Sequence, residues 1–376
     1  MKVIELIAKD YTLQLVSLGS MLLGIISGVL GSFAVIKKQS LLGDAVSHAA
    51  LPGICLAFII IGTKKTEVLL LGALISGLLA TFIITSIVKY SKIKFDSALA
   101  LVLSVFFGGG LVLMTYIQKL PNANQAGLDK FIYGQASTLL ERDVRIMFIL
   151  GVVLIPVVIL FWKEFKIATF DEAFAESVGF STGRINMLIL FMIVIAIIIG
   201  LQTVGVILMS AMLIAPAVAA RQWTDRLSIM VLLSALFGAI SGVTGTIVSS
   251  LVSNLPTGPT IVLIISGIVL LSLIFAPNRG LFRRILKNSK GYRLIYEDIV
   301  LVNIYDLHFK RGEDSKNIDF ENIKASLNMK EKSNRKLEKL LASLNYRGLV
   351  NKEYNMWSIN DKGISYIKNN IKGGGE

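Results

Sequence analysis

Two side chains with metal-binding chemistry, Asp44 and His48, lie four residues apart in an apolar run near the start of the chain. On a helix, this spacing places both side chains on one face. A carboxylate oxygen beside an imidazole nitrogen suits Mn²⁺, Fe²⁺ or Zn²⁺. In a bilayer-spanning helix, an ionisable residue costs roughly 2.5–3.5 kcal/mol and by default indicates a functional site facing a cavity.

The same pair also has a purely structural interpretation. Asp44 comes seven residues after Lys37, so it fits a helix N-cap at a membrane interface, and His48 fits a hydrogen bond to a neighbouring helix. His48 is, however, the only histidine in residues 1–280, and it shares its helix face with an acid. We therefore predict that Asp44 and His48 bind a metal ion, with helix packing as the alternative.

A second pattern, in residues 170–179, predicts a short helix between two longer apolar segments. Asp171 fits its N-cap and Gly179 its stop, while Phe174 and Val178 form an apolar side. Such a helix is too short to cross a bilayer. We expect it to dock a soluble partner; the alternative is an interfacial helix that lies on the membrane.

The composition indicates a membrane protein. Of the 376 residues, 54 % are hydrophobic and 17 % are charged, and the mean hydropathy is +0.70. Soluble domains carry about 25 % charged residues. This excludes a disordered chain and a simple soluble enzyme. The single cysteine, Cys55, lies in an apolar run and excludes a disulfide framework.

Nine apolar segments are long enough to consider as membrane crossings. They are residues 13–36, 43–62, 68–90, 97–118, 144–162, 185–206, 207–221, 227–250 and 258–276. The sixth and seventh form one continuous stretch, in which Gln202, Gly205 and Pro216 are the candidate breaks. Eight crossings is the alternative count.

Charge divides the chain into a membrane domain, residues 1–280, and a basic cytoplasmic domain, residues 281–376, which holds half of the 38 Lys and Arg residues. The basic residues that follow the last apolar segment place that end in the cytoplasm. With nine crossings, the N-terminus lies outside. The expected fold class is an all-α polytopic membrane protein with eight or nine transmembrane helices, followed by a small α+β winged-helix-like domain.

Four segments in the same order resemble the permease subunits of metal-type ATP-binding-cassette importers, the ABC-3 family, which carry manganese, zinc or iron. They are 40–53, 94–100, 170–179, and 211–217 together with 255–262. The resemblance implies a transport subunit, not an enzyme, in the bacterial cytoplasmic membrane. The sequence has no Gly-x-x-x-x-Gly-Lys-Ser/Thr motif, in agreement with ATP hydrolysis by a partner chain.

The resemblance also implies the partners and the roles of the two patterns. Expected partners are ATP-binding-cassette ATPase subunits, an extracytoplasmic metal-binding protein, and a second permease in a homodimer or heterodimer. Asp44 and His48 would line the path of the transported Mn²⁺, Zn²⁺ or Fe²⁺, with no permanently bound cofactor. The element that couples to the ATPase would comprise Asp171, Glu172, Ala173, Phe174 and Gly179.

Residues 291–371 resemble the winged-helix domain of regulators of the diphtheria-toxin-repressor type. The expected elements are helices at 296–307, 331–346 and 361–370, a helix-turn-helix lead-in at 318–327, and two wing strands at 347–352 and 356–360. Lysine and arginine crowd the helix at 331–346, which is the electrostatic footprint of a DNA-binding helix. The same charge suits anionic membrane lipid or a protein, so the partner stays open between DNA, lipid and protein.

Two other functions compete with ATP-driven transport. A membrane-tethered, metal-linked transcriptional regulator would act through the C-terminal winged helix, but a tether needs only one or two spans. A proton-coupled metal carrier would need no ATPase, and the pattern at 170–179 disfavours it. The sequence therefore favours import of a divalent transition metal.

Overall fold

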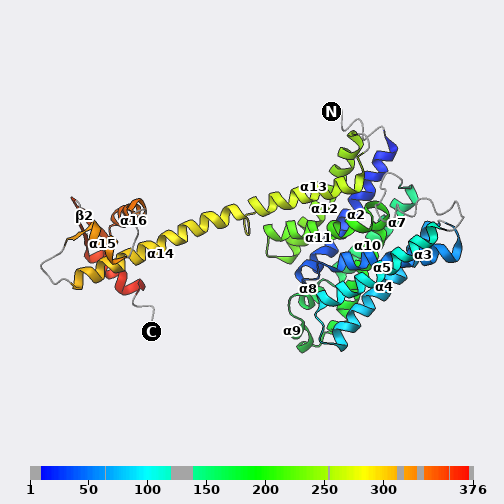
Figure 1. The fold of residues 1–376 in the computed structure, drawn as a ribbon, viewed down its shortest axis with the longest axis horizontal. Helices are drawn as coiled ribbons and strands as arrows, with labels where there is room; N and C mark the ends of the chain where they lie inside the picture. Colours follow the sequence, from blue (N-terminus) through cyan, green and yellow to red (C-terminus); the bar gives the residue numbers. More distant parts are fainter. Residues whose placement is uncertain are drawn as a thin grey trace. The chain divides into compact units, whose positions relative to one another are not determined.

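The structure is a computed structural model that describes residues 10–63, 65–119, 139–252, 255–310, 317–327, 334–354 and 356–371. The chain divides into two compact units, residues 1–281 and residues 282–376 (Figure 1). Each unit has its own hydrophobic core, and the two are described one at a time.

Unit 1, as far as it is described, is built from helices (Figure 1). Eight of the described helices are long and apolar enough to cross a membrane: α2 (Tyr11–Ile36), α3 (Leu42–Ile61), α4 (Thr66–Tyr90), α5 (Phe95–Gln118), α7 (Glu141–Leu160), α10 (Thr182–Val204), α12 (Leu227–Leu251) and α13 (Thr257–Phe275). The others are α8 (Trp162–Phe170), α9 (Glu172–Ser177) and α11 (Val206–Trp223). The expected polytopic helical fold is confirmed.

The sixth and seventh apolar segments form two helices, α10 and α11, that meet at Gly205. Gly205 has a φ of +87°, a conformation that residues with a Cβ rarely adopt. From there, α11 runs beside α13. A Cβ on Gly258 at the start of α13 would contact Leu208, and near its end the indole Nε1 of Trp223 donates to Ser272 Oγ at 3.0 Å. α11 therefore accompanies a spanning helix over most of its length.

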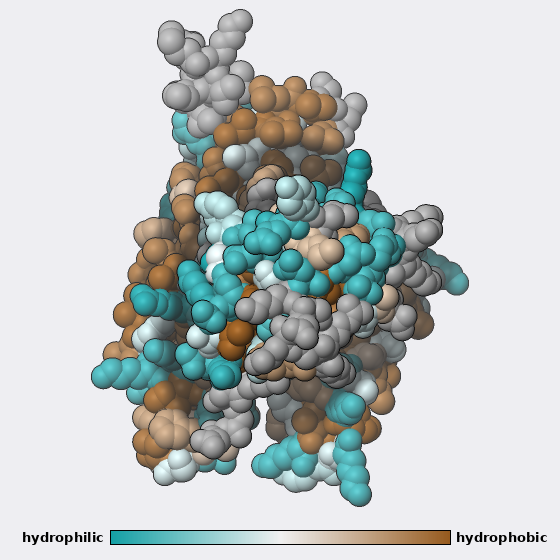
Figure 2. Space-filling view, turned by 90° about the vertical axis from the view of Figure 1, so that its left-hand side faces the viewer, coloured by the Kyte–Doolittle hydropathy of each residue, from teal (hydrophilic) through white to brown (hydrophobic). Residues whose placement is uncertain are grey.

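The outer surface of unit 1 is apolar in a way that soluble proteins avoid. Side chains such as Leu232 (71 % exposed) and Leu263 (73 % exposed) project from the spanning helices. Figure 2 shows hydrophobic residues over wide areas of the visible surface. Lipid chains are the environment that suits such a surface.

α2 and α12 approach each other backbone to backbone. A Cβ on Gly24 would overlap the carbonyl group of Gly238, and a Cβ on Gly238 would overlap that of Gly24. One turn further along α2, Ser234 Oγ donates to the carbonyl oxygen of Gly28 at 2.7 Å. Small residues that let backbones touch are the usual means by which membrane helices associate, because lipid supplies no hydrophobic driving force.

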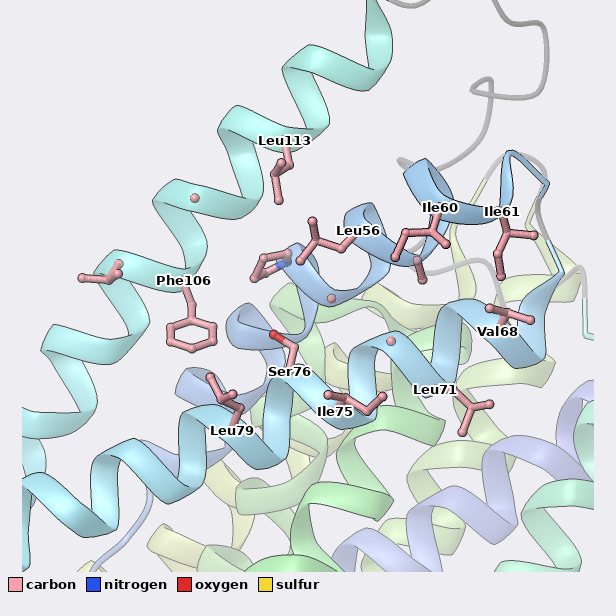
Figure 3. A pocket seen from close by; sticks show the side chains of 16 residues that line it. Leu56, Ile60, Ile61, Val68, Leu71, Ile75, Ser76, Leu79, Phe106 and Leu113 are labelled. Carbon is pink, nitrogen blue, oxygen red and sulfur yellow. The ribbon is translucent and has the colours of Figure 1, made fainter.

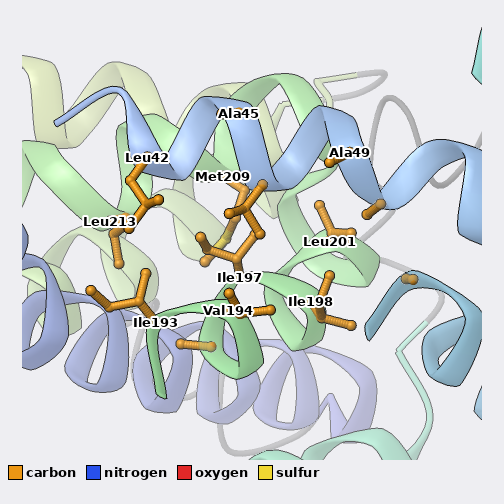
Figure 4. Close-up of a cluster of buried hydrophobic side chains, with 14 of the residues drawn as sticks. Leu42, Ala45, Ala49, Ile193, Val194, Ile197, Ile198, Leu201, Met209 and Leu213 are labelled. Atoms are coloured by element: carbon orange, nitrogen blue, oxygen red, sulfur yellow. The ribbon is translucent and has the colours of Figure 1, made fainter. Parts of the chain in front are cut away.

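α3, the helix that carries Asp44 and His48, packs on α10 and α11. Figure 4 shows Leu42, Ala45 and Ala49 of α3 beside side chains from both helices. These partners are Ile193, Val194, Ile197, Ile198 and Leu201 of α10 and Met209 and Leu213 of α11. Leu42, Ala45 and Ala49 are fully buried, so this face of α3 is fixed in the core, while Asp44 on another face stays partly exposed.

Unit 2 is a small α+β unit. Its helices are α14 (Leu281–Lys310, which begins at the last residue of unit 1), α15 (Phe320–Ser326), α16 (Asn334–Tyr346) and α17 (Asp361–Tyr366), followed by a π-helical turn at Ile367–Ile371. Strands β1 (Ile318–Asp319), β2 (Val350–Glu353) and β3 (Met356–Ile359) form an antiparallel sheet in the order β1-β3-β2. The core contains Ile304, Leu337, Leu341, Leu344 and Trp357.

Several boundaries in unit 2 differ from the prediction. The helix expected at 296–307 begins at Leu281, because no proline interrupts the chain between the two points. The start of the segment 318–327 is strand β1, which pairs with β3 at Ile318 and Trp357. The strands expected at 347–352 and 356–360 correspond to β2 and β3. Residues 331–333, predicted to begin the basic helix, lie outside the described residues.

The close α2–α12 contact predicts a large difference between two glycine-to-alanine substitutions. Gly238→Ala should lower the thermal unfolding midpoint in detergent by several degrees, because overpacking against a backbone costs about 1–3 kcal/mol. Gly267→Ala, in α13, meets nothing within 4 Å and should leave the midpoint unchanged or slightly raised. Equal midpoints for the two variants would contradict the packing.

Candidate functional site

The structure brings the predicted pair together in the first turns of α3. His48 Nε2 lies 3.4 Å from Asp44 Oδ1. The side chain of His48 is 14 % exposed and that of Asp44 is 39 % exposed, so the carboxylate lies at an open surface of the chain. A negative oxygen and an imidazole nitrogen at this separation offer two ligands to one cation.

The surroundings of His48 leave part of its hydrogen-bonding capacity unused. The ring lies edge-to-face against Phe107 of α5, with 4.5 Å between the ring centroids. Its Nδ1 atom is buried and has no hydrogen-bond partner among the described residues, and the same holds for Oγ of the preceding residue, Ser47. Buried polar atoms without partners cost about 1–3 kcal/mol each, and Ser17, Ser27 and His308 share this feature.

One chain supplies too few ligands to enclose a metal. In the described residues, no group of three or more His, Cys, Asp or Glu side chains converges on one point. A closed zinc site takes four ligands. The open side of Asp44 is therefore where a second copy, water or another chain would complete the coordination.

The large pocket between α3, α4 and α5 is a different feature (Figure 3). It has a volume of about 620 Å³ and begins at Pro52, further along α3 than His48. Figure 3 shows aliphatic side chains such as Leu56 and Ile75 pointing into it. Ser76 has the only polar side chain in its lining, and its hydroxyl donates to Ala49 O at 2.6 Å. The pocket offers no ligand to a cation.

The short helix expected at 170–179 is present as α9. Asp171 Oδ1 accepts a hydrogen bond from the backbone N–H of Phe174 at 2.9 Å, which is the geometry of an N-cap. Gly179 has a φ of +92° and ends the segment. The side chains of Phe174 and Val178 are 55 % and 56 % exposed. Two apolar side chains beside a capped helix end form a surface suited to a protein partner.

Glu172 makes a contact that local sequence patterns did not predict. Its Oε1 atom accepts hydrogen bonds from Lys37 Nζ at 2.9 Å and from Asn186 Nδ2 at 3.0 Å, and Lys37 Nζ also bonds Asn186 Oδ1. The hydrogen bond from Lys37 lowers the pKa of the Glu172 carboxyl. Because the folded-state pKa is depressed, the stabilisation is present above the ordinary carboxyl pKa and is lost as the pH falls through the lowered value.

Comparison with known proteins decides the family. The model of the ABC 3 transport family matches residues 9–276. The chain belongs to this family. It is 51 % identical over 281 residues to the zinc transport system membrane protein TroC of Treponema pallidum, covering 75 % of this chain and 94 % of that protein. It is 46 % identical over 299 residues to the manganese transport system membrane protein MntC of Bacillus subtilis, covering 80 % of this chain and 69 % of that protein.

A solved structure of the family agrees in fold. The chain is similar to PsaBC from Streptococcus pneumoniae in complex with Fab, with a TM-score of 0.66, 31 % identity, and coverage of 77 % of this chain and 99 % of the other. The family model ends at residue 276, so it includes Asp44, His48 and α9 and leaves unit 2 outside. Unit 2 thus gains no support from the ABC 3 family for its resemblance to a winged helix.

Proposed function

We propose that this chain is the permease subunit of an ATP-binding-cassette importer for Mn²⁺ or Zn²⁺ in a bacterial cytoplasmic membrane. The observation that most supports this proposal is the Asp44–His48 pair, which lies on a helix long and apolar enough to span the bilayer. Its His48 Nε2 and Asp44 Oδ1 atoms are 3.4 Å apart and both side chains are partly exposed. The names of the relatives above narrow the expected ions from three to manganese and zinc.

The pair would act on the ion during its passage. A divalent cation must exchange its water ligands for protein ligands in a medium of low dielectric constant, where unpaired charge is expensive. Asp44 supplies negative charge and His48 a directional nitrogen. Binding has to stay weak enough for release, which suits two ligands from one chain and a complement from a second permease, identical or related.

Orientation and energy supply form the next part of the proposal. With α11 as a ninth crossing, α9 and the C-terminus both lie in the cytoplasm, and the N-terminus lies outside with the metal-binding protein that delivers the ion. The coupling element Asp171, Glu172, Ala173, Phe174 and Gly179 would dock in an ATPase subunit. The exposed Phe174 and Val178 support this assignment.

For unit 2 we retain the winged-helix interpretation as a proposal. A helix followed by a two-stranded hairpin, with a third strand beside β3, supports it. DNA, lipid and protein stay open as its partner. A regulator that acts only through this unit would need few of the spans that unit 1 has.

Substitution of the pair tests the transport proposal. Asp44→Asn and His48→Ala should each reduce Mn²⁺ and Zn²⁺ uptake into proteoliposomes by about tenfold or more, because losing one ligand of a two-ligand set costs ~1.4 kcal/mol or more. His308→Ala changes the only other histidine and should leave uptake unchanged. Wild-type uptake by the Asp44→Asn/His48→Ala double variant would assign the pair to helix packing.

Two glycines with a positive φ, Gly179 and Gly62, test the docking helix. Gly179→Val should abolish co-purification with the ATPase, since Val at a φ of +92° distorts the end of the segment. Gly62→Val is the control: Gly62 has a φ of +68°, a Cβ added there would also meet nothing within 4 Å, and the residue caps the C-terminal end of α3. ATPase binding that survives in Gly179→Val, or is lost equally in both, argues against docking at α9.

Removal of residues 291–376 tests the role of unit 2. The metal pair and α9 both precede it in the chain, so uptake by the shortened protein should stay within about twofold of that of the full chain, a change below ~0.5 kcal/mol. The measurement is Mn²⁺ uptake normalised to the amount of inserted protein. Loss of uptake despite normal insertion would make unit 2 part of the transport machinery.

A further inference from the structure

Three side chains from three separate elements meet where α9 joins the rest of unit 1. Lys37 is the residue that ends α2, Glu172 is the first residue of α9, and Asn186 lies in the early turns of α10. Each side chain is hydrogen-bonded to both of the others. We call these residues the Lys37 cluster.

Burial makes the Lys37 cluster hard to dissociate. The Lys37 side chain is only 7 % exposed, whereas that of Glu172 is 55 % exposed. Withdrawing the carboxylate would leave the ammonium group of a largely buried side chain without its counter-charge, which is unfavourable. If α9 is displaced, Lys37 therefore moves with Glu172 instead of separating from it.

The cluster is also the polar connection from α9 to the start of α3. Among the described residues, the other side-chain hydrogen bond from α9 to a neighbouring element joins Glu176 to Thr182 of α10, and none reaches α3. Lys37, in contrast, opens the five-residue turn that leads to Leu42, where α3 begins.

That turn is well ordered by its own hydrogen bonds. Gln39 N donates to Ala34 O at 2.9 Å, and Leu42 N donates to Gln39 O at 3.1 Å. A displacement of Lys37 is thus carried through the backbone into the first turn of α3, where Asp44 lies.

We propose that Lys37 is a positioning residue that transmits movement of α9 to the start of α3 and so changes the placement of Asp44. The inference rests on the proposed function and deepens it, because it names the contact through which an ATPase docked on α9 would act on the metal pair. Lys37 touches neither the ion nor the ATPase in this account; it links the two.

The test separates ATP hydrolysis from transport. The complex of the full chain with its ATPase is reconstituted in proteoliposomes, and Mn²⁺ uptake and ATP hydrolysis are measured together. Lys37→Met should keep ATPase co-purification and hydrolysis near the wild-type level and lower the number of ions transported per ATP by about fivefold or more, the lower end of typical coupling between sites.

Two further variants make the result specific. Arg279→Met removes an ion pair elsewhere in unit 1, Arg279 Nη2 to Asp225 Oδ1 at 2.6 Å, and should leave the ions-per-ATP ratio unchanged. Exchange of the charges, Lys37→Glu with Glu172→Lys, should restore part of the ratio, because the Asn186 amide can both donate and accept. If Lys37→Met fails to insert, Asn186→Ala, which removes the third member of the cluster and lies outside α9, is measured in the same way.

The outcomes distinguish this inference from the proposed function. A wild-type number of ions per ATP in Lys37→Met, or a defect that the charge exchange does not relieve, would overturn the role of Lys37. The proposed function would stand in either case if Asp44→Asn still reduced uptake. Loss of ATPase co-purification in Lys37→Met would make it a docking residue and also overturn the inference. Normal uptake by Asp44→Asn would instead overturn the proposed function itself.

Discussion

The cost of placing charge in a low-dielectric medium is the constraint on which the rest of unit 1 depends. An aspartate on a spanning helix is expensive unless something compensates it, and a divalent cation in the same place is more so. In the proposed function, Asp44 and His48 would bring the two costs together, since the ion needs the carboxylate and the carboxylate gains from the ion. Asp44 is partly exposed, which leaves its carboxylate accessible.

A weak two-ligand site works only if the helix that carries it is held firmly. α3 presents small and branched apolar side chains to α10 and α11 on one face (Figure 4), while Asp44 stays partly exposed on another. The glycine contacts between α2 and α12 allow the surrounding helices to pack backbone to backbone. The core holds the body of α3, and the Lys37 cluster connects the turn before its start to α9.

Features that depend on short-range spacing could be predicted from the sequence, and those that depend on tertiary contact could not. Asp44 and His48 meet because residues four apart share a helix face, and α9 forms between a cap and a glycine. Gly205 was one of three candidate breaks, and Pro216 is accommodated inside α11. Lys37 and Glu172 are 135 residues apart, so no local sequence pattern predicts their ion pair. Strand β1 has only two residues, which is too short to show the alternating pattern of a strand.

The most direct measurement is pulsed electron paramagnetic resonance of Mn²⁺ bound to the purified permease labelled with ¹⁵N-histidine. The account predicts a hyperfine coupling from imidazole nitrogen that disappears in His48→Ala and persists in His308→Ala. A second coupled nitrogen would indicate that another copy completes the site. A Mn²⁺ signal without nitrogen coupling, or with coupling that survives in His48→Ala, would contradict the claim that Asp44 and His48 together hold the transported ion.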